Sequence, residues 1–167
     1  MAAGTGKRIL VVDDEELMRE FYVRLLASRG YEVATAEHGI AAMQVLETHP
    51  PFDLAIVDLV MPVCNGWQLI DKIRNSPYAS LPLLAVTGLA NSSDELRVVG
   101  QQCEGLMMKA DFDMTTFLQA VERLADLAKQ RADANATATE APVATPDKGD
   151  SPLISVPGTK LTLRPMG

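Results

Sequence analysis

The sequence predicts an α/β fold in which a doubly wound parallel sheet of five strands carries helices on both faces. Five short apolar runs with the length of buried strands alternate with segments of helical periodicity. The links between them are short, which favours right-handed crossovers and a parallel sheet. Four of the runs end in an acidic, hydroxyl or cationic residue, and ligands of open α/β sheets bind at that end of the strands.

The first strand and helix are predicted near the start of the chain. Residues 8–13 form a continuous apolar strand that ends in acid, and residues 15–29 follow as a helix. Asp14 is placed to cap this helix and Gly30 to end it. The apolar stripe expected along the helix consists of Leu17, Phe21, Leu25 and Leu26.

The next elements lead to the centre of the sheet. Residues 31–36 form a short second strand, and a second helix ends before Pro50-Pro51. The apolar residues expected on that helix are Ile40, Met43, Val45 and Leu46. Residues 53–58 form an uninterrupted third strand, which predicts burial on both faces. Gly66 then opens a third helix.

The second half of the domain repeats this alternation. Residues 82–86 form the fourth strand, and Asn91 or Ser92 caps the fourth helix. Residues 103–108 form the fifth strand, and Asp113 caps a last helix. The apolar stripe expected on that helix consists of Phe117, Leu118, Val121, Leu124 and Ala128.

The polar residues at the strand ends are expected to form one site. A flavodoxin-like strand order 2-1-3-4-5 is favoured, because it makes the first and third strands neighbours and brings Asp13 and Asp14 to Asp58. Taken singly, these acids could be helix caps, and Thr87 and Lys109 could be ordinary loop or surface groups. Their joint spacing favours a shared site instead.

The expected chemistry is phosphoryl transfer to a carboxylate. Three carboxylates in contact repel one another unless a cation intervenes, and Mg²⁺ prefers such oxygen ligands. Asp58 would be the nucleophile that attacks a phosphoryl phosphorus, and Lys109 would neutralise the phosphoryl oxygens. The Thr87 hydroxyl would donate a hydrogen bond to the phosphoryl group, a contact that distinguishes two states of the protein.

Residues 7–131 resemble the response-regulator receiver domain, the phosphoacceptor of two-component signalling. The resemblance rests on the order, spacing and strand context of four segments: VVDDEELMRE, DLVMPVCNGWQLI, AVTG and MMK. It implies phosphotransfer to Asp58 from a histidine kinase or a histidine phosphotransfer protein, and altered binding to a downstream protein. It also implies Mg²⁺ held by Asp14, Asp58 and the Val60 backbone carbonyl, with Asp13 assisting through water.

Two positions depart from the pattern of that family. Ala110 follows Lys109 where the family usually has a proline joined by a cis bond, and one extra residue precedes Phe112. A cis bond before a non-proline residue costs about 2.5–4 kcal/mol, so a trans bond is expected here. Leu106 occupies the position of a Tyr or Phe that moves inward on phosphorylation, so rotation of a ring cannot be the readout.

Two other functions are open to the sequence. A phosphohydrolase of the haloacid-dehalogenase type also uses an aspartyl-phosphate, but it needs an acid two residues after the nucleophile, where this chain has Val60. A receiver fused to a DNA-reading domain is disfavoured, because no second helical pattern follows residue 131. We therefore expect a phosphoacceptor regulator and not an enzyme. Trp67, beside the site loop, is interpreted as core packing.

Bulk composition limits the location and the partners. The formal charge of −7 and the pI near 4.8 argue against binding to nucleic acid or to an anionic membrane. No apolar run approaches the ~20 residues of a membrane span, and the start lacks a signal-peptide pattern. Cys64 and Cys103 lie far apart and suit reduced thiols, so the sequence predicts a cytoplasmic protein.

The composition changes after residue 131. Residues 132–152 are rich in Ala, Thr, Pro and Asp and poor in large apolar residues, which predicts a flexible linker. Residues 153–167 are apolar and basic, and Lys160 to Arg164 alternates between polar and apolar residues. This tail segment is either unstructured or a strand that docks on an acidic surface.

Overall fold

The structure of the protein is a computed structural model that describes residues 4–49, 51–88 and 93–144. Its elements are β1 (Arg8–Val12), α1 (Glu16–Ala27), β2 (Glu32–Ala36), α2 (Gly39–Thr48), β3 (Leu54–Asp58), α3 (Gly66–Arg74), β4 (Leu83–Thr87), α4 (Ser93–Gln102), β5 (Gly105–Met108), the short 3-10 helix η1 (Lys109–Asp111) and α5 (Met114–Ala144). The five strands pair in parallel in the order β2-β1-β3-β4-β5. The predicted flavodoxin-like order is confirmed.

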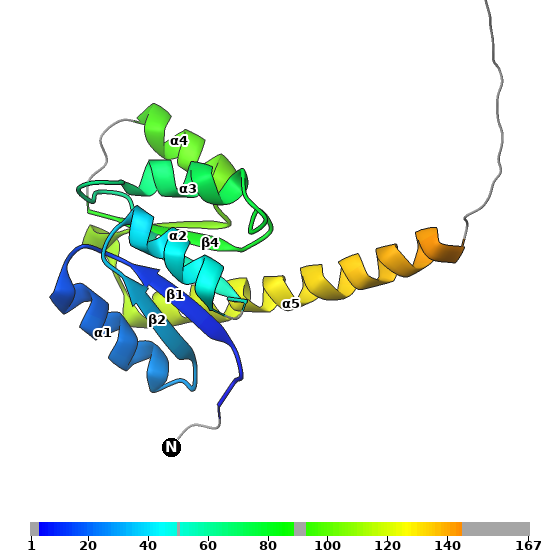
Figure 1. Ribbon diagram of the computed structural model, residues 1–167. Coiled ribbons are helices and arrows are strands. Elements are labelled where there is room, and N and C mark those ends of the chain that lie inside the picture. Colours follow the sequence, from blue (N-terminus) through cyan, green and yellow to red (C-terminus); the bar gives the residue numbers. More distant parts are fainter. Residues whose placement is uncertain (1–3, 50, 89–92, 145–167) are drawn as a thin grey trace, which may run out of the picture. The chain divides into compact units, whose positions relative to one another are not determined.

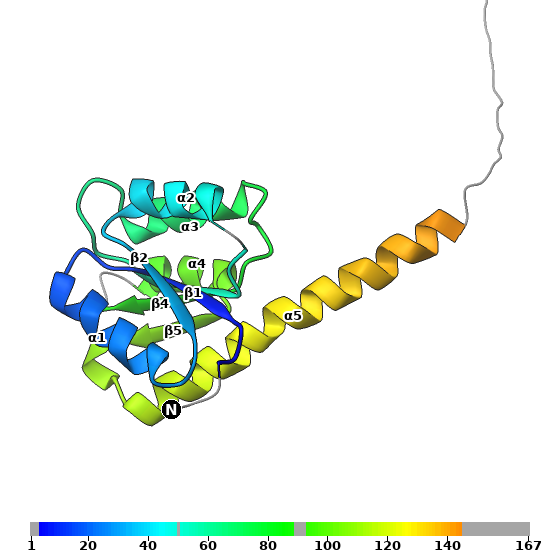
Figure 2. The ribbon, with the colours of Figure 1, turned by 60° about the horizontal axis from the view of Figure 1, so that its bottom comes forward.

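Helices cover both faces of the sheet (Figure 1 and Figure 2). Helices α2, α3 and α4 lie on one face, and α1 with the first part of α5 lies on the other. Along β1, Leu10 and Val12 join the core beneath α2, α3 and α4, whereas Ile9 and Val11 join the core beneath α1 and α5. Burial on both faces explains why β1, β3 and β4 are continuous apolar runs rather than alternating ones.

The strand register brings four polar residues to one edge of the sheet. The residues that precede Asp13 and Asp58 are paired across β1 and β3, so the two carboxylates follow at the same level. Across β4 and β5, Thr87 is paired with the residue before Lys109. Parallel pairing therefore gathers four side chains that are far apart in the sequence.

The ends of the helices confirm two predictions and correct a third. Asp14 does not cap α1, because the capping position is Glu15, whose backbone N–H donates to Asp13 Oδ1 at 2.9 Å. The Asp113 side chain accepts a backbone N–H bond from the first turn of α5 at 2.8 Å, as predicted. Gly30 follows α1 with a φ of 86°, a left-handed conformation that suits glycine at a helix end.

The buried face of α1 matches the predicted stripe in part, since Leu25 and Leu26 pack against the core as predicted. Leu17 is 78% exposed and Phe21 is 38% exposed, whereas Tyr22 and Leu26 are buried against the sheet. Consecutive residues of a helix are rotated by about 100°, so the step from Phe21 to Tyr22 moves the face that packs. The spacing of apolar residues predicted the helix but placed the centre of its buried stripe incorrectly.

Helix α3 begins where the chain passes closest to β3. Asn65 and Gln68 form a reciprocal capping box, in which each side chain accepts from the other's backbone N–H, at 3.0 and 3.3 Å. A Cβ on Gly66 would lie 2.5 Å from the Asp58 carbonyl oxygen, so this approach requires glycine. Trp67 packs against the core beneath α2, α3 and α4, as the sequence predicted.

Helix α5 is longer than the sequence predicts. It continues to Ala144, so the first part of the region interpreted as a linker, residues 132–144, is helical. Alanine is the strongest helix former, and its abundance here explains the continuation without large apolar residues. By its contacts the chain divides into two compact units after Lys129. The tail, residues 153–167, lies outside the described residues.

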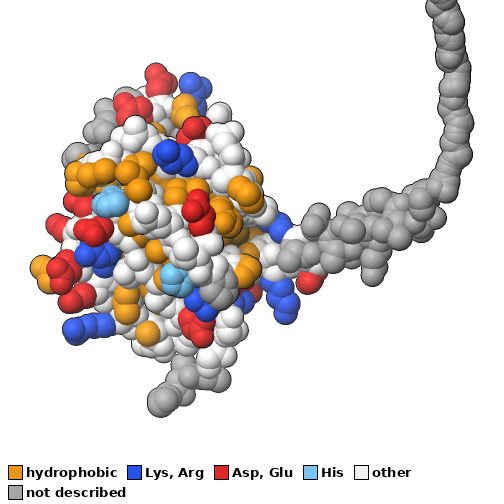
Figure 3. Space-filling view, viewed as in Figure 1, with side chains coloured by type: hydrophobic (Ala, Val, Ile, Leu, Met, Phe, Trp, Pro, Cys, Tyr) orange, Lys and Arg blue, Asp and Glu red, His pale blue; other side chains and the backbone are white. Residues whose placement is uncertain are grey.

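The side chains that the structure describes give no sign of a membrane segment. None of the described helices combines the length and the apolar character needed to cross a bilayer. On the face seen in Figure 3, acidic and basic side chains are interspersed among apolar ones.

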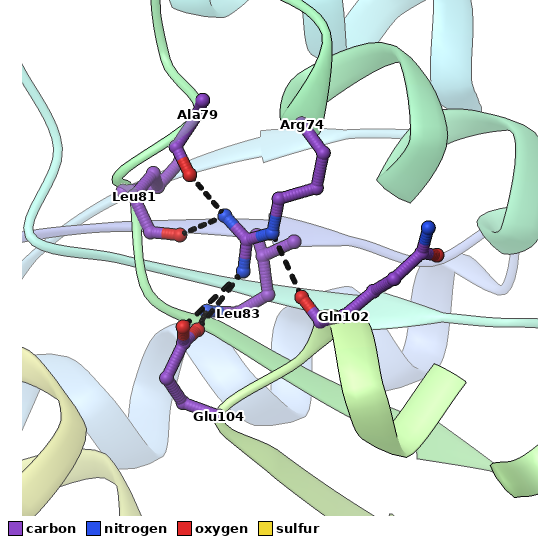
Figure 4. A network of polar contacts seen from close by, with 6 residues as sticks. All are labelled: Arg74, Ala79, Leu81, Leu83, Gln102 and Glu104. Atoms are coloured by element: carbon purple, nitrogen blue, oxygen red, sulfur yellow. Dashed lines mark hydrogen bonds and ion pairs between the residues drawn. The ribbon is translucent and has the colours of Figure 1, made fainter. Parts of the chain in front are cut away.

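Arg74, the last residue of α3, bonds to the end of α4, to the loop before β4 and to Glu104 before β5 (Figure 4). Its guanidinium donates to three backbone carbonyls, those of Gln102, Ala79 and Leu81, at 2.8, 2.6 and 2.8 Å. It also pairs with Glu104 at 3.0 Å, and the Glu104 carboxylate accepts the backbone N–H of the first residue of β4 at 2.7 Å. Both side chains are only 18% exposed, so the pair is screened little by solvent.

Arg74→Met should lower the free energy of unfolding by about 2–4 kcal/mol, because it leaves a partly buried carboxylate and three carbonyls without their donor. Urea unfolding monitored by circular dichroism measures the change. The matched control is Arg97→Met, since Arg97 is 73% exposed and pairs within its own helix at 3.6 Å. That control should stay within about 0.5 kcal/mol of the wild type. Equal effects of the two substitutions would contradict the argument.

Candidate functional site

Three carboxylates meet at the carboxyl edge of the sheet, as the sequence predicted. One oxygen from each of Asp13, Asp14 and Asp58 lies within 4.8 Å of the other two. Asp13 is 2% exposed and Asp58 is 5% exposed, whereas Asp14 reaches solvent. Two acids are therefore held inside the protein, and the third stands at the mouth of the site.

Lys109 connects the two buried acids. It begins η1 directly after β5, and its ammonium lies 3.3 Å from Asp13 Oδ2 and 3.2 Å from Asp58 Oδ2. Burial alone would lower the pKa of Lys109, but attraction to Asp58 and Asp13 outweighs it and raises that pKa above the ordinary value. The ammonium therefore stays charged.

The pKa of the Asp58 carboxyl lies above its ordinary value. Burial raises this pKa, and the charge of Asp13 adds to the effect. The Val60 N–H, which donates to Asp58 Oδ1 at 3.2 Å, and Lys109 act in the opposite direction. Because the net effect raises this pKa, a further positive charge close to Asp58 would stabilise its ionised form.

Thr87 completes the set that the sequence predicted. It is the last residue of β4, it is fully buried, and its neighbour across the sheet precedes Lys109. The register of the central strands thus places its hydroxyl-bearing side chain at the same edge as the acids. All five predicted polar side chains lie at this edge of the sheet.

The loop after β3 is held in a strained turn. The Cys64 N–H donates to the Pro62 carbonyl at 2.8 Å, which makes Val63 the centre of a three-residue γ-turn with a φ of 69°. Val63 is β-branched and 75% exposed, so packing within the chain does not offset the strain. Cys64 is anchored, because its carbonyl accepts the Gly39 N–H at 3.1 Å. Nothing in the sequence pattern predicts this turn.

The segment after Lys109 is held by aromatic packing. No described peptide bond is cis, so the expectation of a trans bond before Ala110 is confirmed. The Phe112 ring lies 5.8 Å from that of Phe21 and 5.1 Å from that of Phe117, measured between centroids. These contacts join the lysine loop to α1 and α5. Leu106 lies on β5 and is 38% exposed.

Arg19 also contributes to the site, although the sequence pattern does not predict it. Arg19 donates from its guanidinium to the Asp13 backbone carbonyl at 2.6 Å. It lies on α1 one turn beyond the acid pair, and an isolated basic residue on a helix gives no signal of such a role. The contact holds the backbone of the buried acid, while the Asp13 side chain pairs with Lys109.

The donor set fits a hard divalent cation. Three carboxylates against one ammonium leave a formal charge of −2, and oxygen ligands suit Mg²⁺. Asp13, Asp14 and Asp58 are the side chains that could hold such an ion.

Comparisons with known proteins agree with this geometry. Residues 9–122 match the family model described as the response regulator receiver domain. The chain is 30% identical over 116 residues to Regulator of RpoS of Escherichia coli strain K12, an alignment that covers 70% of this chain and 34% of that protein. The chain thus spans about a third of that relative's length.

In two further comparisons the aligned region covers most of the other protein. The polar-differentiation response regulator DivK of Brucella anthropi is 28% identical over 104 residues, which cover 62% of this chain and 84% of DivK. The solved structure of response regulator protein TrrA from Thermotoga maritima, in complex with Mg(2+)-BeF, has a TM-score of 0.63 and 30% identity. That comparison covers 71% of this chain and 98% of the TrrA chain.

Asp13→Asn and Asp14→Asn should each weaken Mg²⁺ binding by about tenfold or more, since each removes a charged oxygen from a small ligand set. The free energy of unfolding of the metal-free variants should be equal to or above that of the wild type, because crowded like charges repel. Calorimetric titration with MgCl₂ at constant ionic strength checks the first point. Asp71→Asn, at an exposed position, serves as the control. Unchanged Mg²⁺ affinity in both variants would exclude the site.

The stability of the metal-free protein should fall as the pH rises through the titration of Asp58. Because burial raises the pKa of Asp58 above its ordinary value of 3.8, the folded state holds this proton more tightly than the unfolded state does. The resulting stabilisation is complete below the ordinary value and is lost as the pH rises through the raised one. Asp58→Asn removes this dependence, so its stability relative to the wild type should increase as the pH rises from below the ordinary value of 3.8 through the raised pKa.

Urea unfolding in EDTA at several pH values measures this difference. Asp94→Asn, whose side chain is 86% exposed, should give a difference that is constant over the same range. A pH-independent difference for Asp58→Asn would contradict the raised pKa.

Proposed function

This chain belongs to the response regulator receiver domain family, and we propose that it accepts a phosphoryl group on Asp58 with Mg²⁺ and thereby changes its binding to a downstream protein. The observation that carries the proposal is the position of Asp58. Its carboxylate is buried at the end of β3, 3.2 Å from the Lys109 ammonium, and clusters with two further acids. No other residue of the site combines these neighbours with a place at the end of the central strand.

The proposed donor is a phosphohistidine of a histidine kinase or of a histidine phosphotransfer protein. A carboxylate oxygen of Asp58 attacks the phosphorus in line, the new P–O bond forms and the P–N bond to the imidazole breaks. The departing imidazole nitrogen then takes a proton from solvent. Lys109 turns from the two carboxylates toward the phosphoryl oxygens, and the Thr87 hydroxyl donates to one of them.

The residues proposed to hold Mg²⁺ are Asp14, Asp58 and the Val60 backbone carbonyl, with Asp13 acting through water. When bound, the ion supplies positive charge that neutralises the phosphoryl oxygens in the transition state. The ligand set is supported by the acid cluster and by the Val60 N–H, which ties that segment of the loop to Asp58.

We do not favour a phosphohydrolase that turns over external substrates. Such an enzyme of the haloacid-dehalogenase type needs an acid two residues beyond the nucleophile to protonate the leaving group, and Val60 stands there, 40% exposed. The chemistry we propose is limited to phosphorylation and dephosphorylation of the protein itself. A steady-state assay with p-nitrophenyl phosphate tests this limit, because multiple turnovers would establish the enzyme instead.

With acetyl phosphate, Asp58 should acquire one phosphoryl group only when Mg²⁺ is present, since an anionic donor is otherwise repelled by the acid cluster. Intact-mass spectrometry should show a single addition in the wild type and in the control Asp94→Asn. Asp58→Asn should show none. Full labelling of the Asp58→Asn variant would place the acceptor elsewhere.

A further inference from the structure

Strand β2 forms one edge of the sheet, and the outer side of its backbone is open (Figure 1). Among the described strands it pairs with β1 alone. The Glu32 N–H donates to the Lys7 carbonyl at 2.9 Å, so the backbone groups of Glu32 point toward β1. Because these groups alternate in direction along a strand, those of Val33 and Thr35 point away from the sheet. Open backbone groups of this kind can pair with a strand of another chain.

The sequence of β2 does not protect this edge. Edge strands commonly avoid pairing through lysine, proline or a bulge. Strand β2 has neither residue, and its register with β1 is regular over all five positions. Its one charged residue, Glu32, is already paired with Arg8 at 2.9 Å. Val33 and Thr35 are β-branched and favour strands, so the outer side of β2 is suited to a further strand.

A shallow hollow of about 370 Å³ lies between α1 and this edge. Its lining residues are Glu16, Arg19, Glu20, Val23 and Arg24 of α1 and Thr35 of β2. Two carboxylates and two guanidinium groups give this surface no net formal charge, whereas the whole chain carries −7. A second acidic molecule can therefore approach here without net repulsion from the residues that it meets.

A second copy of the chain is complementary to the open edge. In a dimer with two-fold symmetry the same residues face each other on both copies. Antiparallel pairing of two β2 strands about Ala34 would set Val33 of each copy opposite Thr35 of the other, and each such pair exchanges two backbone hydrogen bonds. Ala34 lies on the α2 side of the sheet. Opposed strands come closest at that position, where a small side chain fits.

The charges on α1 are complementary under the same symmetry. A two-fold axis at the β2 edge makes the two α1 helices run antiparallel, so the start of one lies beside the end of the other. Glu16 is the first residue of α1, and Arg24 follows two turns later. Both side chains are exposed, and neither forms an ion pair within the described part of the chain. Each Glu16 would therefore face the Arg24 of the other copy.

We propose that the protein forms a homodimer in which two sheets join along β2 and the α1 helices pack against each other. The interface lies within the first of the two units of the chain, which ends at Lys129. Because the sheets join side by side, the carboxyl edge that carries Asp58 stays open in both copies. The inference does not depend on the proposed phosphorylation of Asp58.

Sedimentation velocity of the full chain, from micromolar to millimolar concentration, tests the edge pairing. The wild type should pass from monomer to dimer. Thr35→Pro removes the outward N–H but no bond to β1, so it should raise the dissociation constant at least tenfold. Thr35→Ala keeps that N–H and is the matched control, with the dissociation constant of the wild type. Circular dichroism of each variant verifies that it is folded.

Charge exchange on α1 tests the orientation of the two copies. Arg24→Glu alone and Glu16→Arg alone should each weaken the dimer about tenfold, because each places like charges opposite one another. An equimolar mixture of these two variants should dimerise as the wild type does, since the opposite charges meet again. A loss of folding in either variant could not produce this recovery. Arg97→Glu, at a position on α4 that is 73% exposed, should dimerise as the wild type does.

Two results would overturn the inference. One is a wild type that remains monomeric at every concentration. The other is a dimer that withstands Thr35→Pro and both charge substitutions, because its interface would then lie on another face. Phosphoryl uptake from acetyl phosphate tests Asp58 separately, so failure of the dimer and failure of the proposed function are distinguished.

Discussion

The site depends on one ammonium shared by two buried carboxylates. Asp13 and Asp58 end neighbouring parallel strands, so the sheet itself forces two like charges together inside the protein. Without a cation between them, the two buried carboxylates would repel each other with little screening by solvent. Lys109 supplies that cation at 3.3 and 3.2 Å, and it arrives from β5 on the other side of β4. Strands β1, β3, β4 and β5 must therefore all pair in register for the Lys109 ammonium to lie between the two carboxylates and offset their repulsion.

Other parts of the domain keep this arrangement in place. Aromatic rings hold the lysine loop against α1 and α5, and Arg74 with Glu104 joins α3 to the segments that flank β4 and β5. The loop after β3 is bent by the positive φ of Val63 and is anchored at Cys64. Rigid supports on both faces of the sheet allow a strained loop and crowded charges at its edge.

The strands and the site residues could be predicted from the sequence, because buried parallel strands leave continuous apolar runs and their last residues are marked by a change in polarity. The details that failed depend on tertiary contacts. The spacing of apolar residues on α1 did not reveal that Tyr22, rather than Phe21, is buried. The Asp13 side chain binds the backbone of Glu15, where Asp14 was expected to cap the helix. The turn at Val63 could not be predicted, since a β-branched residue is among the least expected at positive φ.

Trp67 gives the molecule an optical property that follows from its position. It is the sole tryptophan of the chain, and it follows the glycine whose backbone approaches Asp58 most closely. Its indole nitrogen is buried and has no hydrogen-bond partner among the described residues. Tryptophan emission of the protein therefore arises from a single residue next to the loop after Asp58, and cation binding and unfolding can both be tested by that emission without an added label.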